Sequence, residues 1–155
     1  MISDTINQKI AESLKAKDET KVTTYRLLSS ALNYEFIAKQ HQLSEEEEWA
    51  VVNREIKKRK EAIEALRQAQ GKLTSSKVSV PERIKKEEKE MELLYEFLPK
   101  QLSDEEIEKL VSDAVSKTNA SGLSDMGKVI GMVMVVAKGR IDGGKVAQVV
   151  KDKLS

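Results

Sequence analysis

The sequence predicts an all-helical protein with four helices in an N-terminal domain, residues 1–98, and three in a small C-terminal domain, residues 99–155. Apolar residues recur every three or four positions along most of the chain, which is the period of one helix face. Aromatic residues make up only 4%, and both prolines stand at predicted helix boundaries. With 155 residues, the chain is long enough to bury a core in one ordinary domain or two small ones.

The N-terminal domain begins with three predicted helices, over about 3–17, from about 19 to 40, and from 44 to 71. In the third, Ser44 and Glu47 form a capping box, and the acidic run Glu45–Glu48 suits the positive end of the helix dipole. Each helix follows from an apolar stripe on one face. The stripes are Ile2, Ile6, Ile10 and Leu14, then Val22, Tyr25, Leu28, Leu32 and Phe36, then Trp49, Val52, Ile56, Ile63 and Leu66.

The fourth helix follows a polar connection, residues 71–80, and takes Pro81 at its first position. Pro99 ends it. Because Ser103 and Glu106 make a second capping box directly afterwards, the segment Leu98–Gln101 is the predicted domain boundary. The inward-facing residues of the fourth helix are Ile84, Met91, Leu94, Tyr95 and Leu98.

The C-terminal domain is predicted as helices over about 104–118, 125–137 and 143–154. Ser124 or Asp125 caps the middle helix, Gly139 ends it in a left-handed conformation, and Asp142 caps the last helix. The predicted core residues outside the middle helix are Ile107, Leu110, Val111, Val115, Val146, Val149, Val150 and Leu154.

Gly127 and Gly131 lie four residues apart on one face of the middle helix. Each costs roughly 1 kcal/mol in helix propensity relative to alanine. Since a glycine in a helix usually marks a close approach, we expect either another helix or the backbone of a ligand on this face, and we favour the helix.

Arg59 interrupts the apolar stripe of the third predicted helix. A charged side chain on a core seam needs a partner, so we expect an ion pair with Glu55, four residues earlier, or with Glu35 from the second helix. The alternative is that Arg59 joins a basic surface with Arg54, Lys57, Lys58 and Lys60. We interpret most of these neighbouring side chains as solvated.

The chain offers few residues for catalysis. His41 is the single histidine and Cys is absent, which excludes a thiol nucleophile and a thiolate metal site. No phosphate-binding loop is present, because Gly127 and Gly131 lack the preceding strand, and the residues after Asp142 are too few for a calcium loop. We therefore expect no catalytic residue, no metal and no cofactor. The carboxylates that we expect to be solvated or capping are Glu45–Glu48, Glu87, Glu88 and Glu90.

Composition also bounds location and partners. No apolar run approaches the roughly 20 residues of a membrane span, and a chain without cysteine suits a reducing compartment, so we expect a cytoplasmic protein without membrane contact. Charged residues make up 34% and nearly cancel, leaving a formal net charge of +1. That balance gives no global signature of a polyanion-binding protein. Positive charge nevertheless gathers after residue 122, where basic side chains outnumber acidic ones.

The segments Asp125–Gly131 (DMGKVIG) and Lys138–Val146 (KGRIDGGKV) resemble the C-terminal signature of the YqeY family. These small bacterial proteins share this domain with the tail of the B subunit of aspartyl/glutamyl-tRNA amidotransferase. The similarity continues upstream in the same order and covers nearly the whole chain, through Arg26–Leu28, Arg54–Glu61 and Leu98–Ser103. Two apolar positions depart from the family pattern, Val135 where a proline is common and Ile141 where a small residue is usual.

The resemblance implies a function connected with tRNA. In amidotransferases the related tail helps to hold tRNA while other domains perform the glutamine-dependent amidation, and a similar domain is attached to some glutaminyl-tRNA synthetases. We therefore expect a non-catalytic tRNA-binding accessory module, with amidotransferase or aminoacyl-tRNA synthetase components as further partners. The alternatives are a protein-interaction module that docks through the glycine face, and a component of a carbon–nitrogen ligase with glutamine as amide donor. The oligomeric state is not predicted.

The predicted tRNA contacts are basic side chains around the glycine-rich turn, namely Lys128, Lys138, Arg140 and Lys145. Asp142 should occupy the amide groups at the start of the last helix, so a phosphate there would meet competition. Arg140 has an alternative, purely structural role, which is to cap the carbonyl groups that end the preceding helix.

Overall fold

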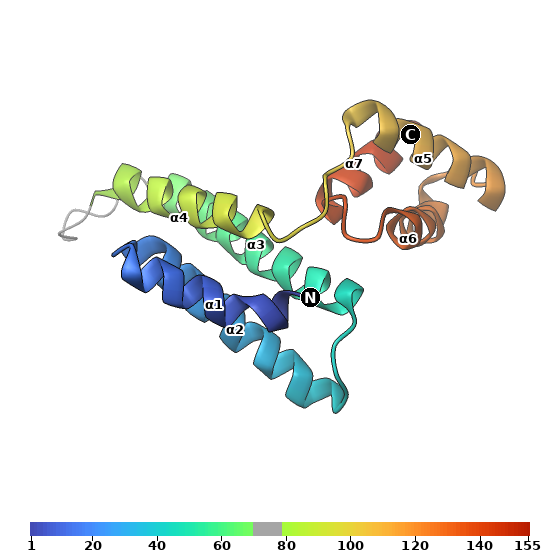
Figure 1. Cartoon of the computed structure of the whole chain (residues 1–155). Helices are drawn as coiled ribbons and strands as arrows, with labels where there is room; N and C mark the ends of the chain where they lie inside the picture. The colour runs from blue at the N-terminus through green and yellow to red at the C-terminus, as the bar shows by residue number, and fades with distance from the viewer. Residues whose placement is uncertain (70–78) are drawn as a thin grey trace. The chain divides into compact units, whose positions relative to one another are not determined.

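The computed structural model describes residues 1–69 and 79–155, and in these ranges it is built from helices without a strand (Figure 1). The predicted all-helical class is confirmed. The helices are α1 (Ile2–Lys15), α2 (Glu19–Lys39), α3 (Glu45–Gln68), α4 (Val80–Tyr95), α5 (Asp104–Thr118), α6 (Met126–Ala137) and α7 (Gly143–Leu154), with a short 3₁₀ helix, η1 (Leu123–Asp125), before α6.

The described residues form two compact units, Met1–Phe97 and Leu98–Ser155. The first contains α1–α4 and the second contains α5–α7 with η1. That these two units are separate domains stays a prediction. The predicted polar connection lies outside the described residues except at its end, where the Ser79 hydroxyl caps α4 by accepting from the Glu82 amide at 3.4 Å. Helix α4 therefore begins at Val80, one residue before Pro81.

In the first unit, α1 packs along α2 and α3 packs along α4, while α2 also contacts α3 and α4 (Figure 1). Tyr25 and Phe97 add an edge-to-face ring contact, with centroids 5.4 Å apart. The buried apolar residues are Ile2, Ile6, Val22, Tyr25, Leu28, Leu32, Leu43, Val51, Val52, Ile56, Ile63, Leu93 and Leu94.

Two members of the predicted stripes are exposed. Leu14 and Phe36 are each about half exposed. Phe36 lies near the end of α2, where none of the residues 33–40 is buried although α3 forms ion pairs with Glu35 and Lys39. The sequence pattern could not reveal this, because the apolar period continues where burial ends.

Glu48 corrects the expectation that the acidic run is solvated. Its carboxylate is completely buried and accepts from the Ile2 amide at 2.6 Å, from the Ser3 amide at 3.1 Å and from the Ser3 hydroxyl. Helix α1 has no side-chain cap of its own, so a residue of α3 satisfies its first amides. The adjacent Trp49, predicted as core, is only half-buried.

Arg59 forms the predicted ion pair with Glu55, whose carboxylate lies 3.3 Å from Nη1. A second partner, Glu90 of α4, lies 3.1 Å from Nε and is also buried, which contradicts its prediction as a solvated residue. Glu35 instead binds Arg54 at 2.6 Å. The buried Arg59 is thus held between two carboxylates from two helices, as a buried charge requires.

Candidate nucleic-acid interface

The second unit is organised around one apolar cluster shared by α5, α6 and α7. Val129, Val133 and Ala137 of α6 face this cluster at four-residue spacing. The remaining buried members are Ile107, Val111, Ala114, Ile141, Val146 and Val150. Ile141, which departs from the family pattern, therefore fills part of the core. Because α6 uses one stripe for packing, its opposite side is left to face outward.

The outward face of α6 carries the two helical glycines. A Cβ added at Gly127 or at Gly131 would meet no neighbouring atom within 4 Å, and both residues are exposed. No helix of the second unit therefore packs on these glycines, contrary to the packing that we favoured from the sequence. The propensity cost of roughly 1 kcal/mol for each glycine is not offset by any close contact inside the unit.

Apolar side chains surround these glycines on the same helix. Val135 continues the spacing of Gly127 and Gly131 by four residues and is 73% exposed, while Leu123 and Val136 are about half exposed. We name the surface formed by Leu123, Gly127, Gly131 and Val135 the glycine face. Its apolar members were not predicted from the sequence, although the four-residue spacing from Gly127 to Val135 is a signal that could identify one of them.

Lys128 lies beside the glycine face. It is exposed in the first turn of α6, and its position three residues before Gly131 puts both on neighbouring parts of the helix surface. Lys138 follows the last residue of α6 with a left-handed backbone, φ 45°, and Gly139 follows with φ 77°. The left-handed cap thus begins one residue earlier than predicted.

Arg140 is tied to the end of α6. Its Nε donates to the Ala137 carbonyl at 3.4 Å, its amide donates to the same carbonyl at 3.0 Å, and its own carbonyl accepts from the Leu102 amide at 2.9 Å. The structural role considered for Arg140 is therefore present. Glu106 lies within electrostatic reach of it: the Ser103 backbone amide holds the pKa of Glu106 below its usual value, the Ser103 hydroxyl adds to this effect, and Lys100 and Arg140 contribute less.

Lys145 has a carboxylate partner, since its ammonium group forms an ion pair with Asp104 at the start of α5.

Asp142 caps α7 as predicted, with Oδ1 accepting from the Gly144 amide at 2.9 Å. Asp125 precedes α6 but does not cap it, because its carboxylate accepts from the Ser121 amide at 3.1 Å instead. Of the four candidate cations, Lys128 therefore lies beside the glycine face, whereas Lys138, Arg140 and Lys145 already interact with other groups.

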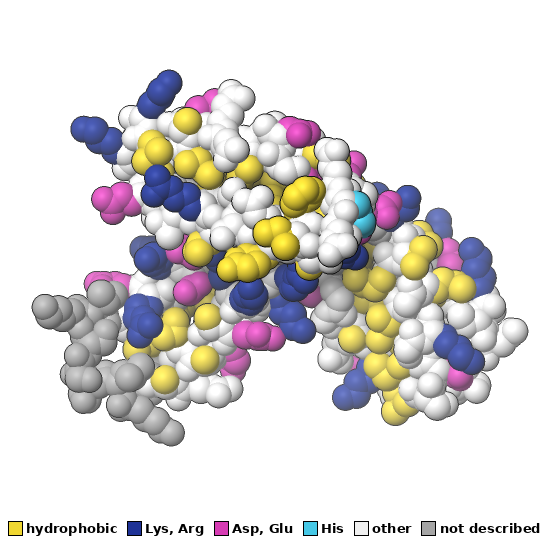
Figure 2. Space-filling model, turned by 90° about the horizontal axis from the view of Figure 1, so that it is seen from below, with side chains coloured by type: hydrophobic (Ala, Val, Ile, Leu, Met, Phe, Trp, Pro, Cys, Tyr) yellow, Lys and Arg dark blue, Asp and Glu magenta, His cyan; other side chains and the backbone are white. Residues whose placement is uncertain are grey.

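The remaining ionisable side chains of the described residues do not gather into one site. His41 is exposed, with Nδ1 2.8 Å from the Gln42 carbonyl and Nε2 3.6 Å from the Glu47 carboxylate. In the described ranges, no three His, Asp or Glu residues are grouped to hold a metal ion. Basic and acidic side chains are interspersed on the surface drawn in Figure 2.

No single helix in the part of the chain that the structure describes is long and apolar enough to cross a membrane. One bent pair, Asp104–Thr118 with Leu123–Ala137, reaches the required length and composition only when its two parts are taken together. Both parts contribute buried residues to the core of the second unit.

Comparison with protein-family models matches residues 3–154 to the family described as Yqey-like protein. The match spans nearly the whole chain, including both compact units. A search of curated proteins found none that matches.

Proposed function

We propose that this chain, which belongs to the YqeY-like protein family, is a tRNA-binding accessory module without catalysis of its own. The observation that carries the proposal is the glycine face of α6, which no part of its own unit covers. Bare helix backbone lets a phosphodiester chain or an unstacked base approach closely. The exposed apolar side chains around it offer contact area for bases and ribose.

The four candidate phosphate contacts can be ranked by their position and by the groups with which they already interact. Lys128 ranks first because it is exposed beside the glycine face. Lys138 and Arg140, at the other end of α6, rank after it, because both already interact with other groups and Arg140 Nε donates to the Ala137 carbonyl. Lys145 ranks last, because a phosphate would have to displace Asp104.

A second candidate uses the same surface. The exposure of Leu123 and Val135 favours an apolar partner, such as a helix of an amidotransferase or aminoacyl-tRNA synthetase component. In that case the chain is a protein-interaction module, or the non-catalytic part of a carbon–nitrogen ligase that uses glutamine as amide donor. Such binding depends on buried apolar area and responds weakly to salt, whereas tRNA binding responds steeply.

The experiment is a salt titration of tRNA binding to the full chain. If all four cations contact phosphates, log K falls against log salt with a slope of about −3 to −4, at roughly 0.7–0.9 per contact. Lys128→Ala is expected to flatten this slope by up to about one unit, and Lys145→Ala by less. Lys117→Ala, an exposed lysine of α5, is the control. An unchanged affinity in the variant with all four residues replaced by alanine contradicts the proposal.

A further inference from the structure

Helix α2 carries a second apolar stripe that its own unit does not bury. The stripe consists of Leu27, Ala31, Tyr34 and Ala38, whose spacing of four, three and four residues is that of a coiled-coil seam. Leu27 is 49% exposed and Tyr34 is 76% exposed. Ile37, 68% exposed, lies next to the seam on the same helix. The inward stripe through Tyr25, Leu28 and Leu32 lies on the opposite side of α2 and is fully used by the core.

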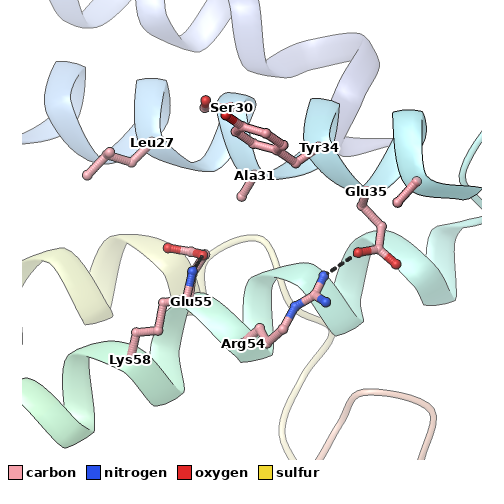
Figure 3. A pocket seen from close by; sticks show the side chains of 9 residues that line it. Leu27, Ser30, Ala31, Tyr34, Glu35, Arg54, Glu55 and Lys58 are labelled. Atoms are coloured by element: carbon pink, nitrogen blue, oxygen red, sulfur yellow. Dashed lines mark hydrogen bonds and ion pairs between the residues drawn. The ribbon is translucent and has the colours of Figure 1, made fainter.

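The seam borders a groove of about 530 Å³ between α2 and α3 (Figure 3). Arg54, Glu55 and Lys58 form its wall on α3. Their charges are compensated within the unit, because Arg54 binds Glu35 at 2.6 Å and Lys58 binds Glu55 at 2.7 Å. A wall with paired charges favours an uncharged helix surface over a polyanion, since neither sign of charge is left in excess.

We propose that the occupant of this groove is α2 of a second copy of the chain, running antiparallel. An antiparallel seam places the first and last members of the stripe opposite each other, and likewise the two middle members. Leu27 then faces Ala38 of the second copy, and Ala31 faces its Tyr34. Each large side chain meets a small one, so both pairs fill the space between the helices without overlap. The stripe is thus complementary to itself under a two-fold axis, which a binding site for an unrelated helix does not require.

The size of the seam sets the strength of the association. Residues 27–38 span about 17 Å of helix, and an interface of this length lies at or below the low end of the roughly 1,200–2,000 Å² that stable complexes bury. The dimer is therefore weak and is expected to form only at high protein concentration, approaching about 1 mM. It leaves the glycine face of α6 out of the interface and does not depend on tRNA binding.

Sedimentation of the full chain tests the dimer. The weight-average mass is expected to rise from 17.4 kDa in dilute solution toward twice that value as concentration approaches about 1 mM. Tyr34→Glu should abolish the rise without changing helical content, because the side chain is exposed. Phe36→Glu, a change at a half-exposed position on the same helix but off the seam, should leave it intact. A chain that stays monomeric at about 1 mM, or equal effects of the two variants, overturns the proposal.

Disulfide cross-linking tests the antiparallel register of the two α2 helices. Because the native chain has no cysteine, only the introduced cysteines can form a disulfide. An equimolar mixture of Leu27→Cys and Ala38→Cys chains should form the mixed disulfide at least several-fold faster than a mixture of Leu27→Cys and Phe36→Cys chains. Equal rates in the two mixtures overturn the antiparallel pairing.

Discussion

Glu48 is the cap of a helix to which it does not belong. Its burial and its three donors from Ile2 and Ser3 connect α3 to the beginning of α1. In the sequence it is one of four consecutive glutamates, and nothing in that run separates it from its neighbours. Its role depends on donors more than 40 positions away, so it could not be predicted from local spacing. Glu90 was misinterpreted for the same reason, since its partner Arg59 lies on another helix.

Glu48→Ala is expected to lower the free energy of unfolding by about 2–4 kcal/mol, because it leaves buried amide donors without an acceptor. Urea unfolding of the full chain measures the loss. Glu45→Ala is the matched control, and as an exposed first-turn glutamate it should cost less than about 1 kcal/mol. Equal losses in the two variants would show that Glu48 acts only through the helix dipole.

At the scale of the element, the capping boxes were the most reliable sequence signals. Both predicted boxes are present with both of their hydrogen bonds, at Ser44 with Glu47 and at Ser103 with Glu106. The signal is local, since cap and partner are three residues apart, so tertiary packing does not alter it. Asp125 shows where a capping signal fails, because the Ser121 amide, which lies outside α6, donates to its carboxylate.

The second capping box makes stability depend on pH. The pKa of Glu106 is lowered in the folded chain, chiefly by the Ser103 amide, so its contribution is present above the usual value of 4.5 and is lost as pH falls through the lower folded pKa. The stability difference between the native chain and Glu106→Gln is therefore expected to shrink between pH 7 and about pH 3. Urea unfolding at both pH values measures it, with Glu105→Gln as the neighbouring control. A difference that is the same at both pH values would contradict this assignment.

At the scale of the whole molecule, the all-helical class and most of the helix bounds could be predicted, because apolar period and capping are properties of short segments. The exposed surfaces of α6 and α2 could not be predicted in this way. Gly127 and Gly131 were expected to be covered by a helix, whereas their unit leaves them open. Phe36 was assigned to the core and the seam through Tyr34 was not predicted, because the apolar period does not show how deeply each turn of α2 is buried.

The core of the second unit lies wholly within residues 98–155, from Ile107 to Val150. We therefore predict that a fragment of residues 98–155 folds by itself, with lower stability than the full chain because a small domain buries a smaller share of its surface. Circular dichroism and a cooperative urea transition measure this. A fragment without helical signal would contradict the prediction and would show that the first unit is needed for folding.

The central claim is that tRNA binds on the glycine face, and Gly131→Ala tests it most directly because it separates binding from folding. The new methyl group meets no atom of its own unit, so the unfolding free energy should rise by up to about 1 kcal/mol. On the proposed interface the same methyl group blocks close approach, so tRNA affinity should fall about tenfold or more, equivalent to about 1.4 kcal/mol. Gly122→Ala, also without a neighbour within 4 Å but outside α6, should leave affinity unchanged. A more stable Gly131→Ala chain that binds tRNA as tightly as the native chain would contradict the account.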